Sequence, residues 1–109
     1  MKYNKFLKLG SVIKLKDETK RIMIIGYLQT PKDVNDNSLF DYIGCLYPEG
    51  VTSANKTYTF NHDKIEKVYN DPFEDSETKS FLIVLNSIEK QIFQLGANKV
   101  KNQTVYNNE

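Results

Sequence analysis

The chain has 109 residues, a formal net charge of +1 and 39% hydrophobic residues. That length supports one compact domain, since single cores usually belong to chains of roughly 100–200 residues. The near-neutral charge gives no reason to expect general nucleic-acid binding, and a single cysteine forms no internal disulfide. The apolar runs fall far short of the roughly 20 residues that cross a bilayer. We therefore expect a small cytoplasmic protein without a secretory signal, a metal site or a cofactor.

The charge is unevenly distributed along the chain. Residues 1–21 carry a local charge of +5, and the remainder carries −4. A basic stretch of this kind attracts nucleic acid or an acidic partner. Its lysines are also typical of the solvent face of a strand, and few aromatic rings stand between them to stack bases. We favour the second interpretation, so nucleic acid is the weaker prediction for a partner.

Residues 9–28 predict a β-hairpin. Residues 11–16 alternate in side-chain character, with lysines on one face, and residues 17–20 form a polar turn. The apolar run that follows is rich in β-branched residues. Because Ile22–Ile25 is apolar on both faces, we expect a central strand there, and Gly26 predicts a bulge or a sharp bend.

The middle of the chain predicts more short strands. Residues 29–39 are polar and predict a loop, and strands are expected at 40–47 and 56–60. Asn61 is typical of the cap of a single helical turn, after which a closing strand is expected near residues 65–69. This order predicts a small, strongly bent antiparallel β-sheet or an SH3-like barrel of about five strands.

A C-terminal amphipathic helix is predicted over residues 75–95. Its apolar residues recur at alternating spacings of four and three and form one stripe, which comprises Phe81, Leu85, Ile88, Ile92 and Leu95. Asp71 before a proline is typical of a helix start, and Asp75 or Ser76 is an equally good cap one turn later. Gly96 predicts the end of the helix.

These elements predict an α+β fold in one domain. The domain spans residues 8–96, and residues 97–109 are polar enough to predict a disordered tail. A sheet of this size has little core of its own. The sequence leaves open whether the helix packs on its own sheet, swaps between two chains as a homo-oligomer, or binds a partner.

Few residues suggest catalysis. His62 is the only histidine and Cys45 the only cysteine. A cysteine beside a histidine is a known nucleophile–base arrangement, but nothing in the sequence brings these two together. Glu74, Asp75 and Glu77 cluster at the predicted helix start, where carboxylates interact favourably with free N–H groups, so they do not predict a metal site. We expect that the protein is not an enzyme.

Tyrosines on the predicted strands are candidates for binding a partner. Such rings on a small barrel form peptide-binding grooves, although they serve equally well as core or rim. Together with a proline beside them and the helical stripe, they make up the predicted partner-binding set, which is Tyr42, Tyr47, Pro48, Tyr58, Phe81, Leu85, Ile88 and Ile92.

Three segments resemble a known family. Residues 9–29 open with Leu-Gly-Ser-Val-Ile-Lys-Leu-Lys, residues 40–50 read Phe-Asp-Tyr-Ile-Gly-Cys-Leu-Tyr-Pro-Glu-Gly, and residues 60–69 read Phe-Asn-His-Asp-Lys-Ile-Glu-Lys-Val-Tyr. In these segments the chain resembles the domain-of-unknown-function family 4176, which comprises small proteins of Gram-positive bacteria. The resemblance covers roughly residues 8–85.

The resemblance implies a genetic context and no catalytic activity. Members of that family tend to be encoded beside type VII secretion genes, near LXG-type effectors and their small helical targeting factors. The resemblance therefore implies an accessory protein, an adaptor or targeting chaperone that binds such an effector or its helical factors, and it implies no catalytic residues. An immunity-type protein that masks a toxin domain is the alternative, and a nucleic-acid-binding small barrel is a weaker one.

Overall fold

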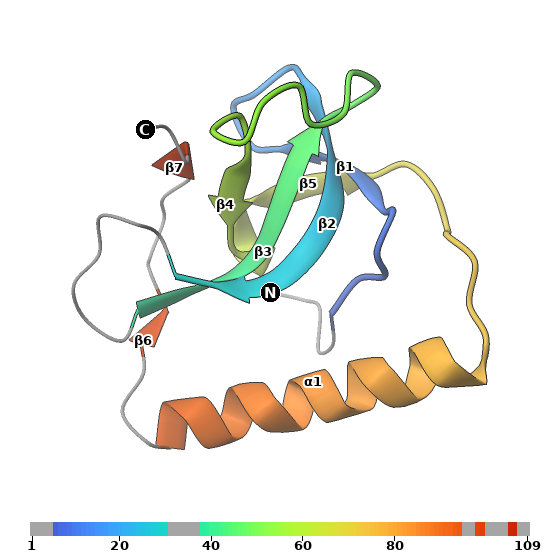
Figure 1. The fold of residues 1–109 in the computed structure, drawn as a ribbon, viewed down its shortest axis with the longest axis vertical. Helices are drawn as coiled ribbons and strands as arrows, with labels where there is room; N and C mark the ends of the chain where they lie inside the picture. Colours follow the sequence, from blue (N-terminus) through green and yellow to red (C-terminus); the bar gives the residue numbers. More distant parts are fainter. Residues whose placement is uncertain (1–5, 31–37, 95–97, 100–104, 107–109) are drawn as a thin grey trace.

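The computed structural model of the chain describes residues 6–30, 38–94, 98–99 and 105–106. A bent β-sheet lies on one side and a single long helix on the other (Figure 1). In chain order the elements are β1 (Val12–Leu15), β2 (Arg21–Gln29), β3 (Ser38–Leu46), β4 (Tyr58–Phe60), the 3₁₀ turn η1 (His62–Lys64), β5 (Ile65–Val68), α1 (Ser76–Gln94), β6 (Asn98–Lys99) and β7 (Val105–Tyr106). The predicted α+β fold is confirmed.

Five antiparallel strands form the body of the sheet, in the order β5-β1-β2-β3-β4. The predicted hairpin is present, since Val12 pairs with Met23 and Lys14 with Arg21 across β1 and β2. β2 lies between β1 and β3, so the strand predicted to be central is central. Strand pairing therefore follows chain order until β5, which returns to pair with β1.

The sheet bends at a bulge in β2. Ile24 pairs with Gly44, but Gly26 pairs with Ile43, so Ile25 is an extra residue without an opposite partner in the ladder. The neighbouring glycine has no room for a side chain, because a Cβ on Gly26 would lie 2.8 Å from Cγ2 of Ile43. The bulge predicted at this position is confirmed, and it curls the sheet around its core.

The bent sheet does not close into a barrel. β4 and β5 are only three and four residues long. η1 connects β4 to β5, which lies at the opposite edge of the sheet, and no ladder joins these two strands in the described residues. Of the two forms that the sequence predicted, the strongly bent sheet is confirmed, and the closed SH3-like barrel does not form.

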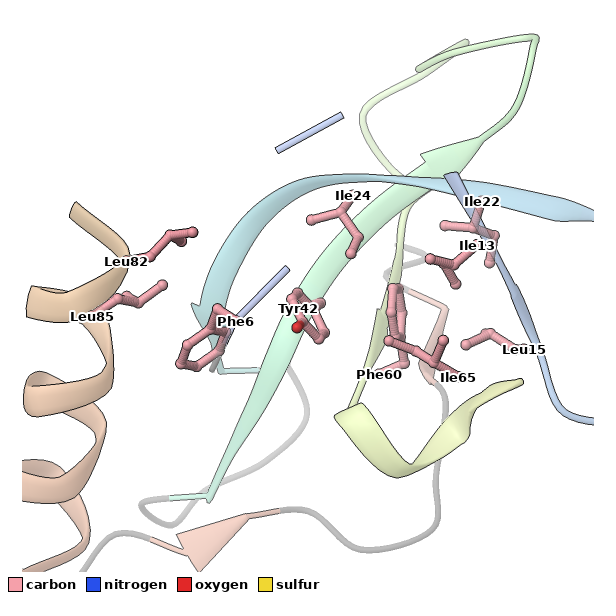
Figure 2. Packing of buried hydrophobic residues seen from close by; sticks show 10 residues of the cluster. All are labelled: Phe6, Ile13, Leu15, Ile22, Ile24, Tyr42, Phe60, Ile65, Leu82 and Leu85. Atoms are coloured by element: carbon pink, nitrogen blue, oxygen red, sulfur yellow. The ribbon is translucent and has the colours of Figure 1, made fainter. Parts of the chain in front are cut away.

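The core fills the inside of the sheet and extends to α1. One cluster of buried hydrophobic residues contains Phe6, Ile13, Leu15, Ile22, Ile24, Tyr42, Phe60, Ile65, Leu82 and Leu85. Figure 2 shows Phe6 between Leu82 and Leu85 of α1 on one side and Tyr42 of β3 on the other. The helix therefore packs on its own sheet, which is one of the three arrangements that the sequence left open.

α1 begins at the later of the two predicted starts. Oδ1 of Asp75 accepts hydrogen bonds from the backbone N–H and the hydroxyl of Thr78, each at 2.9 Å. These bonds cap the helix and lower the pKa of Asp75. Asp71 lies outside the helix, α1 ends at Gln94, and the stop predicted at Gly96 lies outside the described residues.

A buried polar network joins β3 to η1. Asn61, predicted as a cap, makes no capping bond, and its Oδ1 instead accepts a hydrogen bond from the backbone N–H of Asp41 at 2.9 Å. Oδ2 of Asp41 accepts from the backbone N–H of His62 at 2.9 Å and lies 3.6 Å from Nε2 of that ring. Asn61 therefore occupies the predicted cap position of the turn, but its side chain serves a contact between residues 20 positions apart instead of capping η1.

Two tyrosines hold the N-terminal segment on this network. The hydroxyl of Tyr42 accepts a hydrogen bond from the backbone N–H of Leu7 at 2.9 Å and lies 3.1 Å from Nδ1 of His62. With a neutral His62, the Tyr42 proton goes to Nδ1, and Nε2–H faces Asp41. The hydroxyl of Tyr27 donates to the carbonyl oxygen of Leu7 at 2.5 Å. Both backbone groups of Leu7 are therefore fixed.

The substitution Tyr42→Phe tests this anchor. It removes the acceptor of the Leu7 N–H and the polar contact of His62 inside the core, so we expect a loss of about 1–3 kcal/mol in unfolding free energy. Tyr69→Phe removes an exposed hydroxyl and is the matched control, with an expected change below about 0.5 kcal/mol. Urea unfolding measures both, and amide exchange should accelerate at Leu7 only in Tyr42→Phe. Equal effects of the two substitutions would contradict the anchor.

The C-terminal residues add two short strands to the sheet. β6 pairs in parallel with β3, and β7 pairs antiparallel with β4. The sequence predicted disorder over 97–109, but two-residue strands need no apolar pattern and leave no sequence signal. The rest of that range lies outside the described residues, as do residues 31–37 of the predicted loop. The boundary between a domain at 8–96 and a tail stays a prediction.

Candidate functional site

The packing of α1 divides the predicted apolar stripe. Leu85 is buried and Ile92 half-buried, whereas Phe81 and Ile88 are 50% and 39% exposed. The other buried residue of α1 is Leu82, which is not part of the predicted stripe. The inward face is displaced toward Leu82 because α1 docks on Phe6, which lies in the N-terminal segment between the helix and the sheet (Figure 2).

The displaced packing leaves an apolar surface open along α1. Phe81, Val84 and Ile88 are three and four residues apart and so lie on one side of the helix. Val84 is 51% exposed, close to the value for Phe81. We call these three residues the apolar shoulder. Polar side chains are expected at such positions when a helix faces only water.

A cleft continues the apolar shoulder toward the start of α1. It has a volume of about 310 Å³. The N-terminal segment, β2, the linker between β5 and α1, and the first turns of α1 all contribute to it. Its apolar lining consists of Leu9, Tyr27, Phe73, Phe81 and Leu82. In Figure 1 the yellow linker runs down to the start of α1, and the blue N-terminal segment runs down from β1 toward the same helix.

Lys8 ties those two segments together. Its Nζ donates hydrogen bonds to Oδ1 of Asp71 at 2.6 Å, to Oε1 of Glu74 at 3.0 Å and to the carbonyl oxygen of Pro72 at 2.7 Å. The hydrogen bond to Asp71, followed by that to Glu74, raises the pKa of Lys8. The linker and the N-terminal segment therefore form one continuous wall, and the ammonium group is already paired within the protein.

The rim of the cleft is acidic. Among the residues that line the cleft, Asp75 and Glu77 are acidic and Lys8 is basic. Lys8 pairs with Asp71 and Glu74, and Glu74 also pairs with Lys79, so these four carboxylates and two ammonium groups carry a net charge of −2. The sequence explained part of this cluster as helix-start acids, and Asp75 has that role. Glu74 instead accepts a hydrogen bond from Lys8, which lies 66 residues earlier in the chain.

Tyr27 lies at the base of the cleft, and its titration is testable. Burial raises the pKa of Tyr27 to about 12. An unfolded tyrosine titrates near 10, so the stability linked to the neutral phenol is fully present below pH ~10 and is lost as the pH rises through ~12. We expect unfolding free energy to fall across this window and to fall less in Tyr27→Phe. Lysine side chains also lose their charge at alkaline pH, so the measurement is the difference between wild type and variant. Identical pH profiles would contradict the assignment.

His62 and Cys45 are not arranged as a base and a nucleophile. The two ring nitrogens of His62 face Tyr42 and Asp41, whereas Cys45 is paired with Met23 in the β2–β3 ladder. Burial raises the pKa of the Cys45 thiol, and a reactive cysteine needs a lowered one. Within the described residues, no cluster of three or more histidine, cysteine or acidic side chains is placed to hold a metal ion, and no helix has the length and hydrophobicity to span a membrane.

The predicted partner-binding residues on the strands lie away from the cleft. Tyr42 is 0% exposed, so its ring belongs to the core. Tyr47 is half-buried and lies under the guanidinium of Arg21, whose Cζ is 5.1 Å from the ring centroid. Tyr58 packs partly buried against the core, and Pro48 is exposed. The structure does not join these residues to Phe81 and Ile88, and a binding role for Tyr47, Pro48 and Tyr58 stays a prediction.

The sequence analysis missed several residues of the cleft. Phe73 and Leu9 were not singled out, although they are 82% and 54% exposed. One signal was available for Phe73, because a large ring in an otherwise acidic linker has no place in the helical stripe. Leu9 had none, since it opens a segment that also reads as the start of a strand. Their proximity depends on how the chain folds back on itself.

The fold and the cleft define a small α+β domain with an open, acid-rimmed apolar surface beside its helix. The chain belongs to the family DUF4176, a domain of unknown function, whose model matches residues 6–81. This match confirms the resemblance seen in the sequence and includes every residue that lines the cleft except Leu82. No curated protein and no solved structure matches the chain.

Proposed function

We propose that this protein is a non-enzymatic accessory protein that binds another protein, as a cytoplasmic adaptor or targeting chaperone for a type VII secretion effector. The observation that supports binding is the apolar shoulder with the cleft beside it. The LXG-type effector, or its small helical targeting factors, comes from the context that the family resemblance implies.

Exposed apolar side chains of this kind favour a binding role. Phe73, Phe81 and Val84 are each at least half exposed, yet other rings of this chain are fully buried. Burial of apolar surface stabilises by about 25 cal/mol per Å². Contiguous apolar patches on small soluble domains mark interaction sites, whereas scattered apolar residues need no explanation. A partner that covers the shoulder and cleft would gain this free energy.

The polar groups in the interior support a role without catalysis. Asp41, Tyr42 and His62 are at most 8% exposed. Their hydrogen bonds hold η1 and the N-terminal segment in place. These residues therefore have a structural role, which is to position the N-terminal segment beside the cleft.

A second surface gives some support to nucleic acid instead. Lys14 pairs with Arg21 on β2 and with Lys67 on β5, so three cations stand side by side on one face of the sheet. Arg21 and Lys67 lie over the rings of Tyr47 and Tyr69. Titration with single-stranded and duplex oligonucleotides at two salt concentrations tests this function, because phosphate contacts make affinity strongly salt-dependent. These three cations are the weaker candidate for a binding surface, since Lys14 is already paired with Glu66.

Co-expression with the neighbouring LXG-type protein and size exclusion chromatography tests the proposed function. We expect co-elution of the wild type and its loss in Val84→Ser, which places a hydroxyl on the apolar shoulder. Val51→Ser is the matched control, because Val51 is 53% exposed and Val84 51%, but Val51 lies outside the helix. Elution of the wild type as a free species beside every neighbour would refute the proposal.

The immunity alternative uses the same surface and needs a separate readout. Expression of this chain in a cell that is susceptible to the effector distinguishes the two roles. Growth of the protected cell would assign an immunity function. Co-elution without protection would assign the adaptor function.

A further inference from the structure

The cleft beside the start of α1 has a size, an apolar lining and a charge that together describe an occupant. We propose that it takes a segment of a partner protein in which one bulky apolar side chain is flanked by lysine or arginine. This inference rests on the proposed function, since it names the chemistry of the segment that a bound protein would present.

The size of the cleft fits a bulky side chain of a partner. Its volume of about 310 Å³ is at the lower limit of ligand pockets, which span roughly 300–1,000 Å³. The apolar shoulder leads out of it along α1 through Phe81. An apolar side chain in the cleft, followed by contacts along the shoulder, would match a short helical or extended segment.

Several apolar side chains that line the cleft are exposed to solvent. Phe73 is 82% exposed on the linker, and Leu9 is 54% exposed on the N-terminal segment. Phe81 faces the same cleft from α1. Lys8 holds the linker and the N-terminal segment together, so the positions of Phe73 and Leu9 are fixed relative to one another. An apolar side chain between them would be contacted from several sides.

The charge of the rim selects a cation. The four carboxylates and two ammonium groups leave a net charge of −2, and Lys8 is already engaged by Asp71 and Glu74. A helix start ordinarily attracts anions. Here the cap Asp75 accepts the free N–H of Thr78, and Glu77 adds a second negative charge in the first turn. Phosphate, nucleic acid and acidic peptides are therefore repelled, while lysine or arginine gains charge complementarity.

Three synthetic peptides test the occupant on the full-length protein. The first carries leucine and lysine in a helical pattern, the second has glutamate for every lysine, and the third has serine for every leucine. Fluorescence anisotropy with labelled peptides measures their affinities at low and at physiological salt. We expect the leucine–lysine peptide to bind at least about tenfold more tightly than either of the others, and more weakly as salt rises.

Charge-reversal variants assign that binding to the cleft. Glu77→Lys is expected to weaken the leucine–lysine peptide by about fivefold. Glu18→Lys makes the same change on the exposed turn after β1 and is expected to change affinity by less than about twofold. Phe73→Ser should weaken binding without a change in the melting temperature, because that ring is exposed.

Each contrary result would overturn the inference. Equal binding of the lysine and glutamate peptides, equal effects of Glu77→Lys and Glu18→Lys, or no binding of any peptide would remove the cationic segment as occupant. Self-association of the wild type that Glu77→Lys abolishes would assign the cleft to a second copy. If Glu77→Lys and Phe73→Ser still co-elute with an LXG-type protein, this inference is refuted and the proposed function stands. If the leucine–lysine peptide binds but no LXG-type protein co-elutes, the proposed function is refuted and this inference stands.

Discussion

Replacement of Gly44 by alanine is expected to lower the unfolding free energy by about 3 kcal/mol. A Cβ at this position would lie 2.5 Å from Cγ2 of Ile22 and 2.7 Å from the carbonyl oxygen of Met23. The isoleucine methyl group can turn away. The carbonyl oxygen cannot, because it belongs to the backbone of β2, which pairs with β3. The two strands must therefore move apart, and the centre of the sheet loses its packing.

Gly50→Ala separates this clash from the general cost of removing a glycine. Gly50 has φ of +82° and no neighbouring atom within 4 Å of a built Cβ. Its replacement costs only the left-handed conformation, about 1 kcal/mol. Thermal unfolding should place the melting temperature of Gly44→Ala roughly 10 °C below that of Gly50→Ala. Equal melting temperatures would show that β2 and β3 are not closely packed at Gly44.

Phe6→Ala is expected to cost about 3–5 kcal/mol. Phe6 is 2% exposed, and its ring centroid lies 5.4 Å from that of Tyr27, 5.6 Å from that of Tyr42 and 5.0 Å from that of His62. It also lies against the buried leucines of α1 (Figure 2). Its removal opens a cavity between the layers, so the cost includes lost docking of α1 as well as lost transfer free energy.

Phe73→Ala makes the same chemical change on the surface. Phe73 is 82% exposed, so we expect a change below about 0.5 kcal/mol. Urea unfolding gives the free energies, and amide exchange in α1 reports the docking. Most of the stability of a helix in a protein comes from packing of its apolar face, so amides of α1 should exchange faster in Phe6→Ala. Unchanged protection of α1 would show that Phe6 does not join the two layers.

The most distinctive segment of the sequence, residues 40–50, turns out to serve packing. Phe40, Tyr42 and Cys45 are each at most 1% exposed, and Gly44 has no room for a side chain. The sequence analysis named Tyr42, Tyr47 and Pro48 of this segment as candidates for binding a partner. Only its C-terminal part, with Tyr47 and the exposed Pro48, lies toward solvent. Distinctive residues in a small domain are therefore a weak guide to its binding surface.

Local patterns in the sequence determined the elements of this protein. Alternating side chains predicted the β1–β2 hairpin, Gly26 predicted the bulge, and the four-and-three spacing predicted α1, because each signal depends on residues within a few positions of one another. Tertiary structure alone decided the rest. The Tyr42 hydroxyl meets the Leu7 N–H across 35 residues, and Lys8 meets Asp71 across 63. Contacts between distant segments also decide which face of α1 is buried, direct the Asn61 side chain to Asp41 instead of the turn that it precedes, and assemble the cleft. No local pattern records which distant segments the fold brings together.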